Sequence, residues 1–171
     1  MSSRCYPFPM DLLTPCRPAT RADAATIARI YSEGIEDRIA TFETQPRNEG
    51  DVLSWFERPQ PIVVVEDAGK VVAFAAASPS SGRSCYAGNI DFSVYVSRAA
   101  RGRGFGRLAM ESLLDAARKA GFTKLLSGVF PENAASRGLL RTLGFREVGT
   151  YERHGQLDGS WRDVIIVERL L

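Results

Sequence analysis

The sequence predicts an α/β protein built on one mixed β-sheet with helices on both of its faces. Two kinds of pattern support this prediction. Apolar residues recur every three to four positions in several segments, as on the buried side of a helix, whereas nearly continuous apolar runs such as residues 61–66 and 71–77 are typical of buried strands. The expected order, β-α-α-β-β-β-α-β-α-β-β, interleaves helices and strands, which is the pattern of a single sheet covered by helices.

The chain is expected to begin with a short edge strand followed by a helix. Pro18 restricts the strand at residues 16–19 to an edge or an end of the sheet. Thr20, followed three residues later by Asp23, is a typical helix cap with a carboxylate in the first turn. Apolar residues at helical spacing continue to Ile35, and Gly34 is expected to loosen the last turn of this helix.

The next elements are separated by two polar loops, at residues 37–46 and 78–88. Between these loops we expect one short helix and then a β-hairpin. Both strands of the hairpin are nearly all apolar, so helices should cover both of their faces. The predicted helix spans residues 51–58, and the predicted strands are 61–66 and 71–77.

The second half alternates strands and helices, and a glycine follows each helix as a stop signal. Val94, Tyr95 and Val96 favour a strand. The predicted strands are 91–96, 124–130, 145–148 and 161–171, and the predicted helices are 107–120 and 134–143. Residues 153–159 are expected to form a turn-rich loop before the last strand.

Length and composition predict an ordinary globular protein. The 171 residues suit about one domain, which we expect to span residues 14–171 after a flexible leader at residues 1–13. No run approaches the roughly 20 apolar residues of a membrane span, and prolines break up the start where a signal peptide needs an apolar stretch. We therefore expect a cytoplasmic protein that does not associate with a membrane.

Charge and cysteine content exclude two further classes of site. The formal net charge is +2, which offers no case for nucleic-acid binding. Three scattered cysteines and one histidine cannot build a usual zinc site. We expect neither a nucleic-acid partner nor a metal.

The segment from Asp91 to Arg107 is predicted to hold a phosphate-bearing ligand. It runs from a strand through Gly102, Gly104 and Gly106 into a helix. Glycines allow backbone N–H groups to point into one concavity, and the start of a helix adds positive potential there. Three arginines, at positions 101, 103 and 107, add formal charge.

The spacing of this segment separates it from better-known phosphate loops. The dinucleotide fingerprint G-x-G-x-x-G fails because Arg107 stands where the third glycine belongs, and the Gly-Lys-Ser/Thr ending of a P-loop is absent. What remains is Arg101-x-x-Gly104-x-Gly106. A plain glycine-rich turn that caps a surface helix is the alternative interpretation.

The Arg101-x-x-Gly104-x-Gly106 motif resembles the pyrophosphate loop of the GCN5-related N-acetyltransferases (GNAT), which bind acetyl-CoA. Within that superfamily the chain most resembles the phosphinothricin and arsinothricin N-acetyltransferases. The other matching pieces, in order from Arg17 to Leu170, are Arg17-Pro-Ala-Thr-x-x-Asp23, Thr41-Phe-Glu-Thr44, Arg83-x-x-Tyr86, Ser93-Val-Tyr-Val96, Pro131-Glu-Asn133, Leu143-Gly-Phe145 and Gly159-Ser-Trp161-Arg-Asp163.

The resemblance implies a GNAT fold, acetyl-CoA as co-substrate and a small amino acid as acceptor. The acceptor would be the α-amine of a glutamate-like acid with a phosphinate or arsinate side chain, or of methionine sulfoximine, and acetylation would give resistance. Relatives often form homodimers, so a homodimer is expected here. The implied coenzyme-binding residues are Val94, Tyr95, Val96, Arg101, Gly102, Arg103, Gly104, Phe105, Gly106, Arg107, Asn133 and Ser136. Asn133 could instead, or also, cap the helix that begins at Ala134.

The resemblance also places the catalytic carboxylate at Asp91, where the family usually has Glu. A base there would take a proton from the acceptor ammonium, and burial in the strand could raise its pKa. The alternative is that Asp91 only hydrogen-bonds the preceding loop. The substrate-binding residues that the resemblance implies are Phe42, Arg83 and Tyr86, and His154 is a further candidate residue of the substrate pocket. Arg83 and His154 could instead be ordinary surface residues.

One departure leaves the activity open. Many relatives have a Tyr four residues before the Gly-Phe pair, as the acid for the leaving thiolate, but Leu140 stands there and has no proton to donate. A thiolate leaves tolerably without one, and water or Tyr95 is a weaker source of a proton. One alternative is a GNAT enzyme with another acceptor, such as a polyamine, an aminoglycoside or a protein N-terminus. The other is an acyl-CoA-binding module without catalysis, which the missing Tyr and the Asp at position 91 would support.

Overall fold

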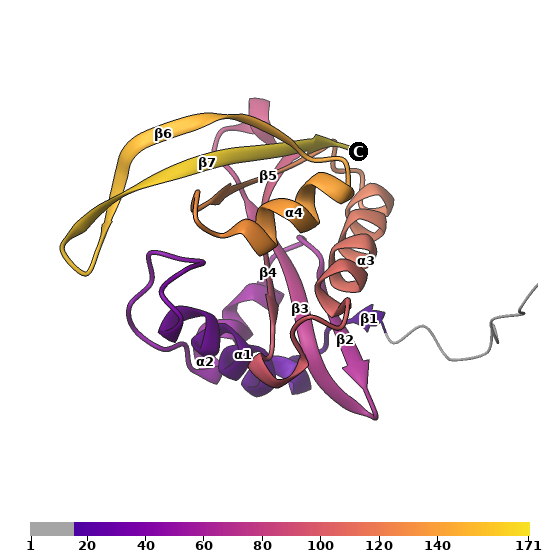
Figure 1. Cartoon of the computed structure of the whole chain (residues 1–171). Coiled ribbons are helices and arrows are strands. Elements are labelled where there is room, and N and C mark those ends of the chain that lie inside the picture. Colours follow the sequence, from indigo (N-terminus) through magenta and orange to yellow (C-terminus); the bar gives the residue numbers. More distant parts are fainter. Residues whose placement is uncertain (1–15) are drawn as a thin grey trace, which may run out of the picture.

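The computed structural model describes residues 16–171, and all of its strands belong to one seven-stranded sheet. The spatial order is β1-β2-β3-β4-β5-β7-β6 (Figure 1). Neighbouring strands are antiparallel except for the parallel pair β4–β5. The strands are β1 (Cys16–Pro18), β2 (Ile62–Asp67), β3 (Lys70–Pro79), β4 (Asn89–Val96), β5 (Lys124–Val129), β6 (Arg146–Leu157) and β7 (Ser160–Leu170).

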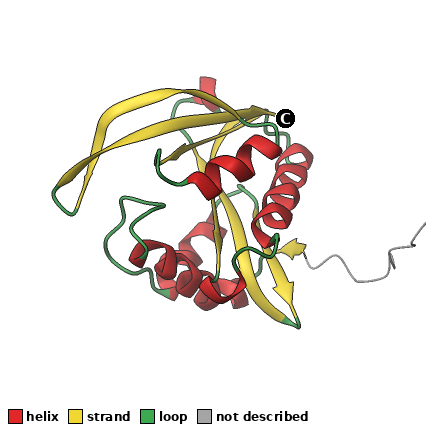
Figure 2. Cartoon of the chain, viewed as in Figure 1, coloured by secondary structure: helices red, strands yellow, loops and turns green. Residues whose placement is uncertain are grey.

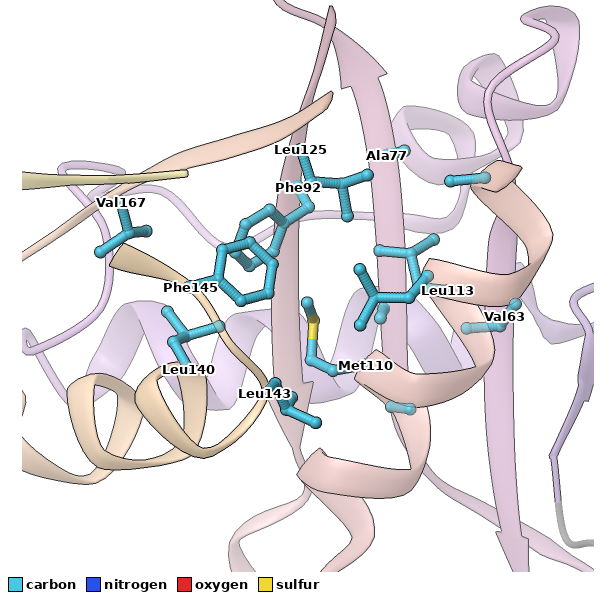
Figure 3. Packing of buried hydrophobic residues seen from close by; sticks show 14 of the residues in the cluster. Val63, Ala77, Phe92, Met110, Leu113, Leu125, Leu140, Leu143, Phe145 and Val167 are labelled. Carbon is cyan, nitrogen blue, oxygen red and sulfur yellow. The ribbon is translucent and has the colours of Figure 1, made fainter. Parts of the chain in front are cut away.

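Helices cover both faces of this sheet, as predicted (Figure 2). The helices are α1 (Ala24–Glu36), α2 (Glu49–Leu53), α3 (Phe105–Lys119) and α4 (Ala134–Thr142). On one face α3 and α4 bury apolar residues such as Met110 and Leu140 against Phe92 and Leu125 (Figure 3). On the other face α1 and α2 pack on alternate residues of the same strands, including Val64 and Phe74. The sheet therefore separates two apolar cores, because side chains alternate along each strand.

The element order predicted from the sequence is confirmed, with differences at several ends. Helix α3 begins two residues earlier than expected, at Phe105, and β4 begins at Asn89. Helix α1 continues past Gly34 instead of loosening there; a Cβ at Gly34 would lie 2.4 Å from Cε1 of Tyr95, so the glycine allows the strand to approach closely. The predicted leader, residues 1–13, lies outside the described residues.

The predicted loop at residues 153–159 is wrong. Strand β6 continues to Leu157, and only two residues, Asp158 and Gly159, separate it from β7. The polar residues that indicated a loop instead form an irregularity in the strand: Tyr151 pairs with Val164 and Gly155 with Arg162, so β6 has two more residues than β7 over this stretch. Arg153 there adopts a left-handed conformation (φ 48°) and its N–H donates to Asp163 Oδ1 at 2.8 Å.

The separation of β4 from β5 creates the opening that the candidate site uses. The two strands pair in register only from Asn89 to Asp91, although β4 continues to Val96 and β5 to Val129. Beyond Asp91, no strand from residues 16–171 pairs with β4 on that side. Among the residues that the structure describes, none of the helices has both the length and the apolar surface that crossing a bilayer would require.

Candidate active site between strands β4 and β5

Two cavities adjoin where β4 and β5 separate. The first, which we call the groove, has a volume of about 500 Å³ and lies between the diverging strands and the starts of α3 and α4. The second, the side cavity, has a volume of about 700 Å³ and is bounded by the α1–α2 loop, β5, β6 and β7. The residues that line both are Ala40, Ser127 and Gly128.

One wall of the groove is the free backbone edge of β4. Peptide groups alternate in direction along a strand, and the N–H of Ser97 donates to Val72 of β3, so the odd-numbered residues of β4 face β3. The N–H groups of Val94 and Val96 therefore point into the groove. Tyr95 lines the groove as well, but its backbone faces β3 and its ring packs in the core beneath α1.

The other wall is the glycine loop, whose geometry fits an anion. Gly102 and Gly104 have φ values of 76° and 86°, which favour glycine, and a Cβ at either position would meet no atom within 4 Å. Within the described chain, no backbone N–H of residues 102–106 donates a hydrogen bond to the protein. These donors, at the start of a 15-residue helix, are those that a diphosphate would accept from.

The arginines of this loop are paired with carboxylates, which the sequence did not predict. Arg101 contacts Asp37 at 2.6 Å, and its Nε donates to the Val96 carbonyl at 3.1 Å. Arg103 pairs with Asp67 at 2.8 Å and lies over the Phe105 ring. Arg107 pairs with Glu111 at 2.8 Å. Of the seven loop positions implied by the resemblance, Arg101, Gly102, Gly104, Gly106 and Arg107 line the groove.

Asn133 both caps helix α4 and closes the groove. Its Oδ1 accepts from the N–H of Ser136 at 3.0 Å, so the predicted cap is confirmed. Its Nδ2 donates to the carbonyl of Ile39 at 3.2 Å, which links α4 to the α1–α2 loop across the groove. Asn133 and Ser136 line the groove. Leu140, on the same helix, is buried.

Asp91 lies at the point where the two strands part, and its side chain lines the side cavity. Ile90 and Phe92, on either side of it, are buried against α3, so the alternation of the strand directs Asp91 to the opposite face. Burial raises the pKa of the Asp91 carboxyl to about 6. No hydrogen bond to this carboxylate occurs among the described residues, including those of the preceding loop. A half-buried carboxylate without a partner is suited to accept a proton near neutral pH.

The side cavity contains two of the four predicted acceptor residues. Phe42, in the α1–α2 loop, packs edge-to-face against Phe130 with ring centroids 4.9 Å apart. His154 of β6 lies on the cavity wall. Arg83 and Tyr86 do not line either cavity; both are exposed, and the Arg83 guanidinium lies 5.7 Å from the Tyr86 ring centroid. Their assignment as substrate-binding residues stays a prediction.

Comparison with known proteins shows the family of the chain. Residues 27–145 match the model of the acetyltransferase (GNAT) family. The chain belongs to the GNAT acetyltransferase family. It is 31% identical over 162 residues to the phosphinothricin N-acetyltransferase of Streptomyces coelicolor, with 91% of this chain and 95% of that protein covered. It is 30% identical over 156 residues to the L-methionine sulfoximine/L-methionine sulfone acetyltransferase of Salmonella typhimurium, with 89% and 91% covered.

A solved structure extends this comparison to the coenzyme. The GNAT superfamily phosphinothricin acetyltransferase (Pat) from Sinorhizobium meliloti, in complex with acetyl-CoA, superposes with a TM-score of 0.85 at 30% identity, covering 91% of this chain and 87% of that one. The predicted resemblance and GNAT fold are thus confirmed. The GNAT chain described here is an N-acetyltransferase that uses acetyl-CoA as its co-substrate.

Sequence reasoning missed two residues of this GNAT site. Ser127 lines both cavities, and its Oγ donates to the Phe92 carbonyl at 2.9 Å, which holds β5 to β4 just beyond their last paired residues. The interruption of an apolar strand by Ser127 and Gly128 is a signal that could have indicated it. The second missed residue is Asp37, which pairs with Arg101. No local sequence pattern indicates it, because the two residues lie 64 positions apart and come into contact only when the chain folds.

Proposed function

We propose that this GNAT enzyme acetylates the α-amine of a glutamate-like amino acid whose side chain ends in a tetrahedral polar group, as in phosphinothricin, arsinothricin or methionine sulfoximine. The observation that carries the proposal is the position of Asp91, a carboxylate of raised pKa that lines the side cavity at the point where β4 and β5 part. The named activities of the relatives from Streptomyces coelicolor and Salmonella typhimurium support the acceptor class.

The groove is proposed to hold acetyl-CoA, which supplies the thioester carbonyl that is attacked. The free N–H groups of residues 102–106 would bind the diphosphate. Those of Val94 and Val96 would bind along the pantetheine arm and donate to the thioester oxygen, where negative charge develops. Because Arg101, Arg103 and Arg107 are paired with carboxylates, the backbone N–H groups supply most of the direct diphosphate contacts in this proposal.

Asp91 is proposed as the general base. Its carboxylate accepts a proton from the acceptor ammonium, directly or through one water, and the amine nitrogen then forms a bond to the thioester carbon. The carbon–sulfur bond breaks, the thiolate of the coenzyme leaves, and the nitrogen gives up its second proton to water as the amide forms. Leu140 cannot protonate that thiolate. A free cysteine thiol has a pKa of about 8.5, and a comparable thiol leaves tolerably as the thiolate without an acid.

The side cavity is proposed to hold the acceptor's side chain. Its walls combine apolar surfaces, such as Phe42 and Phe130, with the polar groups of Thr41, Ser127 and His154. A methylene chain with a polar end would match this combination, because the chain would contact the aromatic rings and the end group would hydrogen-bond the polar side chains.

The direct test is release of coenzyme thiol in a DTNB assay. L-phosphinothricin, arsinothricin and L-methionine sulfoximine should each give saturable release that depends on the acceptor, with spermidine and an aminoglycoside as contrasting amines. Mass spectrometry should place the acetyl group on the α-nitrogen. Release only with the contrasting amines would refute the acceptor class, and tight acetyl-CoA binding without turnover on any amine would instead indicate a binding module.

We also propose that the enzyme is a cytoplasmic homodimer that confers resistance to such toxic amino acids. Exposed Val148 and Tyr151 of β6, with Trp161 of β7, support an interface on the β6–β7 hairpin. Light scattering should give twice the chain mass of 18.8 kDa. Replacement of both Tyr151 and Trp161 by Ser should give the single-chain mass, and an unchanged mass would place the interface elsewhere.

A further inference from the structure

The inner wall of the side cavity is fixed by a contact between a glycine of β6 and an aromatic ring of the α1–α2 loop. An added Cβ at Gly155 would lie 2.8 Å from both Cε1 and Cζ of Phe42 and 3.2 Å from its Cδ1. Carbon atoms in folded proteins do not approach so closely, so the ring occupies the space of the missing side chain. The same ring lines the side cavity and contacts Phe130.

The irregularity in β6 brings Gly155 to this position. Three residues of β6, from Glu152 to His154, lie opposite the single Asp163 of β7 between the pairs Tyr151–Val164 and Gly155–Arg162. His154 lines the side cavity, and the next residue, Gly155, contacts the Phe42 ring. The bulge therefore sets two neighbouring parts of the wall at once.

A second contact holds the hairpin and the α1–α2 loop together. Nε of Arg38 lies 3.0 Å from Oδ2 of Asp158 in the turn between β6 and β7, and another nitrogen of Arg38 donates to the carbonyl of Glu43 at 3.3 Å. The end of the hairpin lies beside this loop (Figure 1). The hairpin and the α1–α2 loop therefore meet at two places, the contact of Gly155 with Phe42 and the ion pair of Arg38 with Asp158.

We propose that Gly155 is a specificity-determining position, which sets the place of the Phe42 ring and so the length of acceptor side chain that the side cavity accepts. A side chain at position 155 forces the ring away from β6 and into the space of the acceptor. The inference rests on the proposed function, because it requires the side cavity to hold the acceptor. Gly155 acts through Phe42 and is a positioning residue, without contact to the reacting atoms.

The test is Gly155→Ala, assayed with two acceptors that differ by one methylene, L-methionine sulfone and S-methyl-L-cysteine sulfone. We expect kcat/KM for methionine sulfone to fall about tenfold and that for the shorter homologue to change less than about threefold. The KM for acetyl-CoA should not change, because Gly155 does not line the groove.

Two further variants complete the design. Gly149→Ala is the matched control: Gly149 lies in the same strand, does not have a positive φ, and a Cβ there would meet no atom within 4 Å, so its kinetics should equal those of the wild type. Phe42→Leu combined with Gly155→Ala should recover most of the loss for methionine sulfone, because the smaller side chain makes room for the added methyl group.

The outcomes separate this inference from the proposed function. Equal losses for both sulfones, or losses that extend to the KM for acetyl-CoA, would show a general packing defect and overturn the inference. Unchanged selectivity in Gly155→Ala would also overturn it. Failure of the wild-type enzyme to acetylate either sulfone, together with phosphinothricin and methionine sulfoximine, would instead refute the proposed function.

Discussion

Replacement of Asp91 by Asn is expected to lower kcat by about 10²- to 10⁴-fold, the usual contribution of a positioned general base. Asn keeps the size of the side chain but cannot accept the proton of the acceptor ammonium. The Kd for acetyl-CoA, measured by calorimetry, should stay within about twofold of the wild type, because Asp91 lines the side cavity and not the groove.

Two other variants are the controls for Asp91→Asn. Asp115→Asn removes a carboxylate from the exposed side of α3, where Asp115 pairs with Arg118 at 3.1 Å, and should leave kcat unchanged. Asp91→Glu restores the residue usual in the family and should retain most of the activity. An Asp91→Asn enzyme with wild-type kcat would show that Asp91 has a structural role only.

Replacement of Gly104 by Ala is expected to raise the Kd for acetyl-CoA about 10- to 100-fold. Gly104 has a φ of 86° and is the N-cap residue of α3, and a left-handed conformation costs other residues about 1–2 kcal/mol. A shift of the loop to relieve this strain would misalign the N–H groups of residues 102–106. Loss of one hydrogen bond to a charged group costs about 1.5–3 kcal/mol, which corresponds to the expected change in Kd.

Gly69→Ala, in the turn between β2 and β3, is the control for the effect of backbone strain alone. Gly69 has a similar φ of 74° and a Cβ there would meet no atom within 4 Å, so this variant should lose similar stability and keep its coenzyme affinity. S-acetylpantetheine, which lacks the diphosphate, should be used equally well by the wild type and Gly104→Ala. If Gly104→Ala lost equal activity with acetyl-CoA and with S-acetylpantetheine, the loop could not be the diphosphate site.

The parts of this molecule that sequence predicted are those that depend on local pattern. Apolar patterns, caps and turn residues predicted the order of the α-helices and strands, and the spacing of Gly102, Gly104 and Gly106 located the loop with free N–H groups. The assignment of Asp91 came from the family resemblance, and the alternation of side chains along β4 accounts for its position, since Ile90 and Phe92 are buried on the opposite face.

The parts that sequence did not predict depend on contacts between distant segments. Glycine and polar residues at 153–157 indicate a loop, yet pairing with β7 keeps them in a bulged strand, because tertiary context overrides local propensity. The pairing of Arg101 with Asp37 neutralises charge that looked available in the sequence. Likewise, nothing local to Gly155 indicates that the Phe42 ring fills the space beside it.

The most direct test of the central claim is the pH dependence of acetyl transfer in a single turnover at saturating acceptor. Asp91 accepts a proton only when ionised, and its pKa is raised to about 6. The rate should therefore be low at pH 5, rise with a midpoint near pH 6 and level off above pH 7, and Asp91→Asn should lack this rise. The same rise with the same midpoint in Asp91→Asn would contradict Asp91 as the base.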